Sequence, residues 1–129
     1  MKLLLDTHFL IWAANEPERL SIHVLDLIED EDNALYFSAC AVWEVAIKNG
    51  RGKPDFRICP WRFRNVLIDN KFIELPITSD HALVVATLPL IHKDPFDRIL
   101  IAQAIHEGNT LLTADATLAQ YPGPIMLVA

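Results

Sequence analysis

Short apolar runs alternate with segments of helical periodicity along the 129-residue chain. The apolar runs predict five short strands, at residues 2–5, 34–37, 72–75, 110–113 and 125–128. Helical patterns lie around them, at residues 7–14, 21–30, 38–48, 60–70, 78–87, 94–107 and 115–120. Because strands and helices alternate, we expect a central parallel sheet covered by helices on both faces, which is a three-layer α/β/α fold.

Residues typical of helix ends support several of these boundaries. Ser21 and Ser38 stand where N-cap side chains accept hydrogen bonds from the first turn, and Pro60 stands at a first helical position. The helix expected at 94–107 has signals at both ends, because Asp94 is its N-cap candidate and Gly108 follows its last residue.

Composition limits the class of protein. Hydrophobic residues make up 52% of the chain and charged residues 22%, which excludes global disorder and indicates a single domain over residues 1–129. No apolar run approaches the roughly 18 residues that span a bilayer, and the first run stops at Asp6, too early for an export signal. We therefore expect a cytoplasmic protein without a membrane segment. Cys40 and Cys59 form no disulfide framework and no CxxC motif, so we expect buried or half-buried free thiols.

Four acidic residues from separate segments are expected to converge at one edge of the sheet. Asp6 directly follows the first strand, and Asp115 comes two residues after the fourth strand ends. Asp97 lies in the first turn of the helix before that strand, and Glu44 lies in the second turn of the helix after the second strand. Ligands of open parallel sheets bind beyond the carboxyl ends of the strands, so this edge is the predicted site.

Such a cluster of carboxylates needs a counter-charge. Two carboxylates about 5 Å apart repel by roughly 3 kcal/mol at an effective dielectric near 20. A hard divalent cation with oxygen ligands removes this repulsion, and Mg²⁺ or Mn²⁺ is the expected occupant. Because such a cation activates water and stabilises charge on phosphate, phosphodiester hydrolysis is the chemistry that fits best.

Each acid also has a purely structural interpretation. Asp97 suits the third helical position beside a helix dipole, and Asp6 and Asp115 suit the capping of the segments that follow them. Spacing alone does not choose between these interpretations. Glu44 has the weakest structural alternative, because its apolar neighbours predict a helix buried nearly all round, where a glutamate needs a partner.

Four segments in order along the chain carry these acids: residues 4–8 (LLDTH), 38–48 (SACAVWEVAIK), 92–104 (HKDPFDRILIAQA) and 112–115 (LTAD). Together they resemble PIN-domain proteins, and more narrowly the VapC-type toxins of bacterial toxin–antitoxin pairs. The similarity covers essentially the whole chain. It implies a metal-dependent endoribonuclease with Mg²⁺ or Mn²⁺ as cofactor, an RNA substrate, a cognate antitoxin protein as partner and a homodimeric assembly.

The resemblance also implies roles for individual residues. The family's catalytic, metal-binding acids correspond to Asp6, Glu44, Asp97 and Asp115, the same four that their placement indicates. Hydroxyl groups supporting this site would come from Thr113, Ser38 and Thr7. Asp94 is the alternative third acid, but Asp97 is preferred because the family's acid stands at the start of the helix that continues through residues 99–104.

Basic residues are unevenly distributed, although the net charge is −6. Residues 48–64 carry six Lys or Arg, one acid and interleaved aromatic residues, as do surfaces that stack single-stranded bases; a solvated helix face above core aromatics is the alternative. The expected substrate contacts are Arg51, Lys53, Lys93 and Arg98, although Arg98 suits a solvated surface position equally well. His8 and His92 are further candidates, with packing beside the site as their alternative role.

Two other function classes share part of this pattern. An aspartate-nucleophile phosphatase typically carries a D-x-D motif, but His8 stands where the second acid belongs. A phospho-acceptor receiver domain, which is a binding module, needs a lysine near its last strand, and residues 125–128 lack one. The charge of −6 excludes binding of nucleic acid by bulk charge, but it permits a locally basic groove leading to a cation-filled acidic centre.

Overall fold

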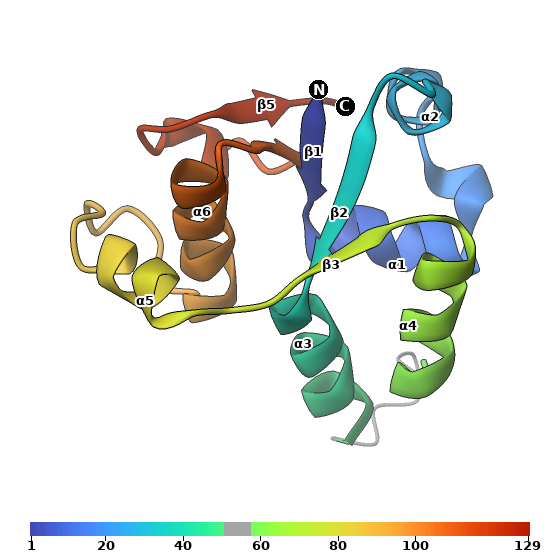
Figure 1. Ribbon diagram of the computed structural model, residues 1–129, viewed down its shortest axis with the longest axis horizontal. Helices are drawn as coiled ribbons and strands as arrows, with labels where there is room; N and C mark the ends of the chain where they lie inside the picture. Colours follow the sequence, from blue (N-terminus) through green and yellow to red (C-terminus); the bar gives the residue numbers. More distant parts are fainter. Residues whose placement is uncertain (51–57) are drawn as a thin grey trace.

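The computed structural model describes residues 1–50 and 58–129 (Figure 1). Its strands are β1 (Lys2–Leu5), β2 (Ala34–Ser38), β3 (Ile73–Leu75), β4 (Thr110–Thr113) and β5 (Ile125–Leu127). Its α-helices are α1 (Thr7–Asn15), α2 (Ile22–Glu29), α3 (Ala39–Gly50), α4 (Pro60–Asp69), α5 (Ser79–Val85) and α6 (Pro95–Glu107). Short 3₁₀ turns occupy Pro17–Arg19 and Leu118–Gln120.

The five strands form one sheet in the order β3-β2-β1-β4-β5, and every neighbouring pair is parallel. β1 lies at the centre, where Leu4 is in register with Tyr36 of β2 and with Leu111 of β4. Because all strands run the same way, their carboxyl ends share one edge. The predicted parallel sheet is therefore confirmed, and the residues that follow β1 and β4 are neighbours in space.

Alternation along β1 divides the core between the two faces of the sheet. Leu3 and Leu5 belong to a core with residues of α1, α2, α3 and α4, whereas Leu4 belongs to a second core with residues of α6. Figure 1 shows this arrangement, with α5 and α6 on one side of the sheet and α1 and α4 on the other. The three-layer α/β/α fold expected from the sequence is confirmed.

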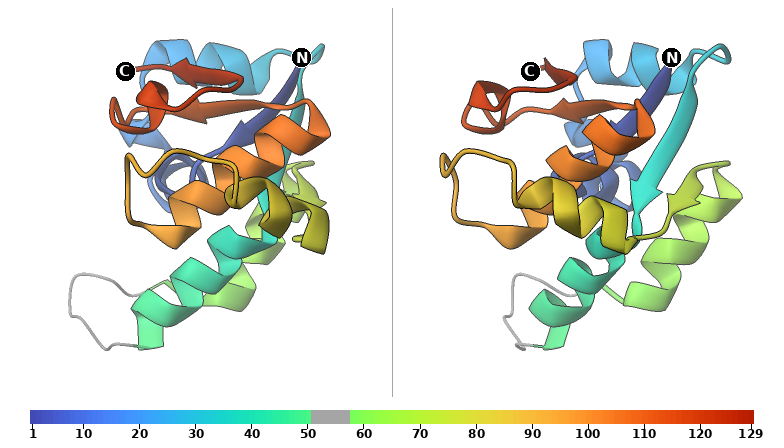
Figure 2. Two further views of the ribbon diagram at one scale, coloured as in Figure 1. Left: turned by 90° about the vertical axis from the view of Figure 1, so that its left-hand side faces the viewer. Right: turned by 60° about the vertical axis from the view of Figure 1, so that its left-hand side comes forward.

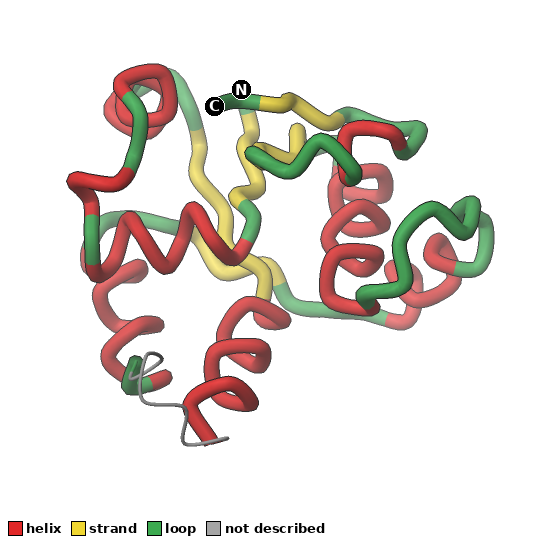
Figure 3. Tube along the Cα trace, turned by 180° about the vertical axis from the view of Figure 1, so that it is seen from behind, coloured by secondary structure: helices red, strands yellow, loops and turns green. Residues whose placement is uncertain are grey.

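α3 and the chain termini lie at opposite ends of the molecule. β2 continues directly into α3, which extends away from the carboxyl edge of the sheet (Figure 2). Both termini lie at the other end (Figure 3). Within the described ranges no helix is long and apolar enough to cross a membrane.

Most helix boundaries follow the capping residues read from the sequence. The Ser21 hydroxyl accepts from the backbone N–H of Val24 at 3.3 Å, and the Asp94 carboxylate accepts from the N–H of Phe96 at 2.9 Å. Gly108 ends α6 at φ 70°, a left-handed conformation in which a Cβ atom is unfavourable.

Three expectations about local structure are wrong. Residues 115–120 form no α-helix, because Oδ1 of Asp115 accepts from the N–H of Thr117 at 2.8 Å, a local turn that competes with helix formation. The helix expected to reach Thr87 ends at Val85. Cys59 is exposed, because it precedes the first turn of α4 rather than facing the core, whereas Cys40 is buried as expected; both thiols are free.

Candidate metal centre

Asp6 is held where β1 ends and α1 begins. Its backbone N–H continues the sheet by donating to the carbonyl of Leu112 at 3.0 Å. Its Oδ1 accepts from the N–H of Phe9 at 3.0 Å, so the side chain is the N-cap of α1, as the structural interpretation expected. The residue is 5% exposed, so a carboxylate is fixed in a nearly dry position at the carboxyl edge of the sheet.

The hydroxyl of Thr113 connects two of the predicted acids. It donates to Oδ2 of Asp6 at 2.6 Å and accepts from the backbone N–H of Asp115 at 3.1 Å. Thr113 is the last residue of β4 and is fully buried, so its own position is fixed by the sheet. This hydroxyl, which was expected to support the site, therefore forms one hydrogen bond with each of two predicted acids.

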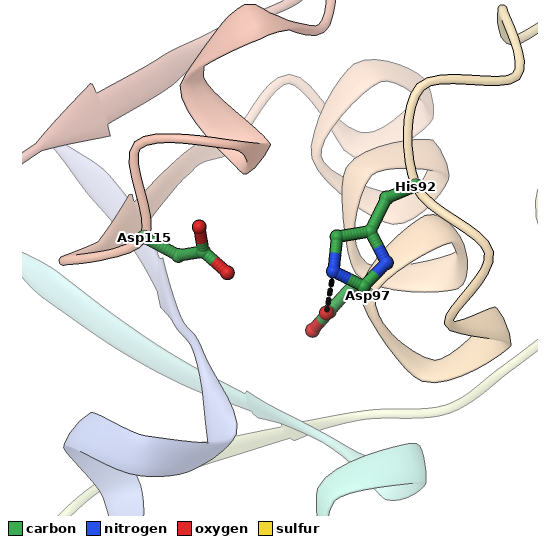
Figure 4. A group of neighbouring side chains, drawn as sticks. All are labelled: His92, Asp97 and Asp115. Carbon is green, nitrogen blue, oxygen red and sulfur yellow. Dashed lines mark ion pairs between the residues drawn. The ribbon is translucent and has the colours of Figure 1, made fainter.

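Asp97 and Asp115 face each other across the sheet edge, with His92 beside Asp97 (Figure 4). Nε2 of His92 lies 3.7 Å from Oδ2 of Asp97. One ligand atom from each of these three residues lies within 4.8 Å of the other two, a spacing at which they could hold one metal ion. Asp94 caps α6, which begins at Pro95. Asp97 is the third residue of this helix and lies in its first turn, at the sheet edge.

Glu44 lies on α3 with 6% exposure, and Oε2 pairs with Nζ of Lys48 one turn later at 2.9 Å. The sequence predicted a partner for this acid, and Lys48 is that partner. However, the helix is not buried all round, because Trp43 is 60% exposed and Ala46 is also exposed. Trp43 packs edge-on against Phe96 of α6, with ring centroids 5.0 Å apart, which holds α3 beside the start of α6.

The acids perturb one another electrostatically. The pKa of Asp97 is raised to about 7, chiefly by burial and additionally by the charges of Asp94, Glu44 and Asp6, while His92 acts in the opposite direction. The pKa of Asp6 is also raised, chiefly by burial and additionally by Asp115, against the lowering effect of its hydrogen bonds. Asp97 is therefore within electrostatic reach of Glu44 and Asp6, and Asp6 is within reach of Asp115.

This donor set fits a hard divalent cation. The four predicted acids offer carboxylate oxygens, which Mg²⁺ and Mn²⁺ prefer. Without a cation, burial raises the pKa of Asp97, and repulsion from Asp94, Glu44 and Asp6 adds to the rise. A bound cation would relieve that repulsion, because it would favour the ionised form of every acid around it.

The other two predicted hydroxyls lie close to this edge and are buried. Ser38 accepts from the N–H of Cys40 at 3.1 Å, so its oxygen supports the first turn of α3. The hydroxyl of Thr7, directly after Asp6, is buried and has no hydrogen-bond partner among the residues that the structure describes. Thr7 therefore leaves a polar atom available next to the acids, whereas Ser38 is engaged in capping.

The predicted basic contacts have different surroundings. Arg98 donates to the carbonyls of Pro89 at 2.8 Å and Val85 at 3.2 Å, which favours an anchoring role over the phosphate contact expected from the sequence. Lys93 is exposed next to His92. The expectations for Arg51 and Lys53 fall outside the described residues, as does much of the basic window.

Sequence reasoning missed one residue of this region and undervalued another. Tyr121 is 4% exposed, and its hydroxyl contacts the backbone of His92 and the guanidinium of Arg98. His92 was expected as a phosphate contact or as a residue packed beside the site, and its ring lies beside Asp97, in agreement with the second alternative. His92 opens the segment 92–104 that carries the family resemblance, whereas no sequence signal marked Tyr121.

Comparisons with known proteins agree with this fold. The PIN domain family model matches residues 3–124. Ribonuclease VapC22 of Mycobacterium tuberculosis is 30% identical over 123 residues, which cover 95% of this chain and 93% of that protein.

Solved structures show the same fold. VapBC2 from Rickettsia felis, bound to a DNA fragment from its promoter, contains a chain that aligns with a TM-score of 0.71 at 16% identity, over 99% of this chain and 98% of that one. A chain of VapBC-1 from nontypeable Haemophilus influenzae aligns with a TM-score of 0.60 at 18% identity, over 93% and 91% of the two chains.

Proposed function

Because this chain belongs to the PIN-domain family and to its VapC type, we propose that it is a divalent-metal-dependent endoribonuclease and the toxin of a toxin–antitoxin pair. The observation that carries the proposal is the placement of Asp97 and Asp115, whose ligand atoms lie within 4.8 Å of each other, with Asp6 and Glu44 close enough to raise the pKa of Asp97. The name of the 30% identical relative, a ribonuclease, supports RNA as the substrate.

Asp6, Asp97 and Asp115 would hold Mg²⁺ or Mn²⁺, and Glu44 would bind it directly or through water. When bound, such a cation lowers the pKa of water and stabilises the negative charge that develops on a phosphate under attack. Thr113 fixes the carboxylate of Asp6 and the backbone of Asp115 in advance, so the ligands need little rearrangement. In the cation-free protein, the ion pair with Lys48 balances the charge of Glu44.

A cleavage assay with one isosteric variant tests this function. We expect the purified protein to cleave single-stranded RNA with Mg²⁺ or Mn²⁺, and to lose this activity in EDTA. Asp6→Asn removes one ligand charge, so it should abolish cleavage. Its amide oxygen can still accept from Phe9 and its NH₂ group can donate to the hydroxyl of Thr113, so the metal-free protein, relieved of a buried charge, should remain at least as stable. The matched control is Asp69→Asn, an exposed acid at the end of α4, which should cleave at the wild-type rate.

Two results would contradict the proposal: wild-type cleavage that persists in EDTA, or wild-type cleavage by Asp6→Asn. If Asp6→Asn unfolds instead, the main role of Asp6 is to cap α1. The cleavage assay is then made with Asp115→Asn in place of Asp6→Asn. Asp115 is exposed and its loss is therefore tolerated more easily by the fold.

The VapC type also supports an antitoxin partner, a homodimer and a cytoplasmic location. The solved complexes with this fold are named VapBC, and one is bound to promoter DNA. We expect expression of this chain to arrest growth, and co-expression of a small neighbouring reading frame to relieve the arrest. Growth arrest by Asp6→Asn equal to that of the wild type would separate toxicity from RNA cleavage and contradict the proposal.

A further inference from the structure

The segment between α5 and α6, residues 86–94, is held against α6 by hydrogen bonds. Arg98 of α6 donates from Nη1 to the carbonyl of Pro89 at 2.8 Å and from Nη2 to the carbonyl of Val85 at 3.2 Å. Leu88 of the same segment is buried in the core of that face. The segment is thus fixed at several points before it reaches the acidic centre.

Tyr121 fixes the backbone of His92 within this segment. Its hydroxyl oxygen accepts from the N–H of His92 at 2.6 Å, and the hydroxyl donates to the carbonyl of the same residue at 3.1 Å. The guanidinium of Arg98 donates to the same oxygen at 3.2 Å. Because Tyr121 is buried against α6, His92 is held to the body of the protein from a position 29 residues along the chain.

The backbone also determines which ring nitrogen of His92 carries the proton. The N–H of Asp94 donates to Nδ1 at 3.0 Å, so Nδ1 is an acceptor and is unprotonated. A neutral imidazole then carries its proton on Nε2. Nε2 is the atom that lies 3.7 Å from Oδ2 of Asp97, so the ring directs an N–H group toward that carboxylate (Figure 4).

This tautomer decides between two roles for His92. Its position within 4.8 Å of Asp97 and Asp115 would allow it to be a third metal ligand. However, a ligand nitrogen must be unprotonated, and Nδ1 is already engaged by Asp94 while Nε2 holds the proton. His92 is therefore suited to donate to a metal-binding carboxylate, as the surrounding groups of metal sites commonly do, and not to bind the ion.

We propose that His92 is a positioning residue of the acidic centre: its Nε2–H group orients Asp97 toward a divalent cation shared with Asp115, and Tyr121 holds His92 in place. The inference rests on the proposed function only in requiring a cation at these acids. The 3.7 Å separation in the cation-free protein exceeds a hydrogen bond, and we expect it to shorten when the cation draws Asp97 into one orientation.

Nuclear magnetic resonance of protein with isotopically labelled histidine tests the tautomer. The His92 signals are identified by their absence in His92→Gln. We expect them to report a proton on Nε2 and none on Nδ1, both in the metal-free protein and after addition of Mg²⁺. A proton on Nδ1 after Mg²⁺ addition would make Nε2 a free ligand atom and overturn the proposal.

Mn²⁺ affinity, measured from the spin-resonance signal of unbound Mn²⁺, tests the positioning role. We expect His92→Ala to weaken Mn²⁺ binding about tenfold, and His92→Gln, whose amide can still donate an N–H, to recover part of that loss. Tyr121→Phe keeps the buried ring and removes only the hydroxyl, and it should weaken Mn²⁺ binding about threefold. The matched control is Thr87→Val, which removes a hydroxyl bonded to Val84 in the same segment, and its affinity should match the wild type.

The outcomes separate this inference from the proposed function. Wild-type Mn²⁺ affinity in His92→Ala, with the melting temperature unchanged, would overturn the positioning role even if the protein cleaves RNA. Weakened Mn²⁺ binding in both His92→Ala and Tyr121→Phe supports it even if no RNA is cleaved. If Thr87→Val weakens Mn²⁺ binding as much as the other two variants do, the positioning role of His92 is overturned. The weaker binding would then result from a disturbance of the whole segment 86–94.

Discussion

The hydroxyl of Thr113 donates a 2.6 Å hydrogen bond to Oδ2 of Asp6, which lies 107 positions away in the sequence. The bond joins the ends of β4 and β1, which are neighbouring parallel strands. The hydroxyl oxygen of Thr113 also accepts from the backbone N–H of Asp115. One buried hydroxyl therefore sets the relative positions of two acids before any cation binds. The sheet thus supplies a preorganised part of the centre.

Thr113→Val tests this link. Valine has the shape of threonine but no hydroxyl, so Asp6 loses a donor and the N–H of Asp115 loses its acceptor. We expect the free energy of unfolding of the metal-free protein to fall by about 1–3 kcal/mol, which is the usual cost of leaving buried polar groups unpaired. Urea unfolding in EDTA measures it. Thr113→Ser keeps the hydroxyl and should recover most of the loss; equal stability of the two variants would show that the hydrogen bonds contribute nothing.

The raised pKa of Asp97 predicts how the stability of the metal-free protein depends on pH. The pKa is about 7 in the folded protein and near 3.9 in an unfolded chain, so the folded state binds this proton more tightly. The resulting stabilisation is complete below about pH 4 and is lost as the pH rises through about 7. We expect Asp97 alone to lower the free energy of unfolding by on the order of 1–2 kcal/mol between about pH 5 and about pH 8, after allowing for screening by solvent.

Asp97→Asn removes this titration. Urea unfolding in EDTA at the two pH values measures the effect. The free energy of unfolding should decrease less from the lower to the higher pH for Asp97→Asn than for the wild type, and the variant should be the more stable protein at the higher pH. The exposed control Asp69→Asn should retain the wild-type decrease. An identical decrease in Asp97→Asn and the wild type would mean that the pKa of Asp97 is not raised in the folded protein.

The basic window, residues 48–64, predicts where RNA binds. We expect Arg51→Glu with Lys53→Glu, made in a cleavage-deficient Asp6→Asn background, to weaken binding of a labelled oligoribonucleotide about tenfold or more at moderate salt. Fluorescence anisotropy gives the affinity. The control Lys2→Glu with Lys71→Glu makes the same charge change beside the amino ends of β1 and β3, and it should bind as the parent does. An equal loss of RNA affinity in both double variants would indicate a general effect of charge and would contradict binding by the basic window.

The sequence predicted the fold and the acids because both depend on short-range patterns. Strand and helix periodicity gave the parallel sheet, and a parallel sheet brings the residues after β1 and β4 to one edge. Asp6 and Asp115 could therefore be located without coordinates. Asp97 followed from its position in the first turn of α6.

The remaining features depend on contacts that no local pattern encodes. The position of His92 is set by Tyr121, 29 residues later, and no periodicity links the two. Arg98 suited a phosphate contact by its place beside Asp97, but carbonyls of the preceding segment engage its guanidinium. The helix expected at 115–120 failed because the side chain of Asp115 bonds to Thr117, a competition between side chain and backbone that helix propensity does not capture.

Calorimetric titration of the metal-free protein with Mn²⁺ at neutral pH tests the central claim, that Asp6, Asp97 and Asp115 belong to one cation centre supported by Glu44. We predict saturable binding by the wild type, accompanied by a rise in melting temperature because the cation binds the folded state. Asp6→Asn, Asp97→Asn and Asp115→Asn should each weaken it about tenfold or more, while Asp69→Asn leaves it unchanged. Wild-type affinity in any two of the three site variants, or no binding by the wild type, would contradict the claim.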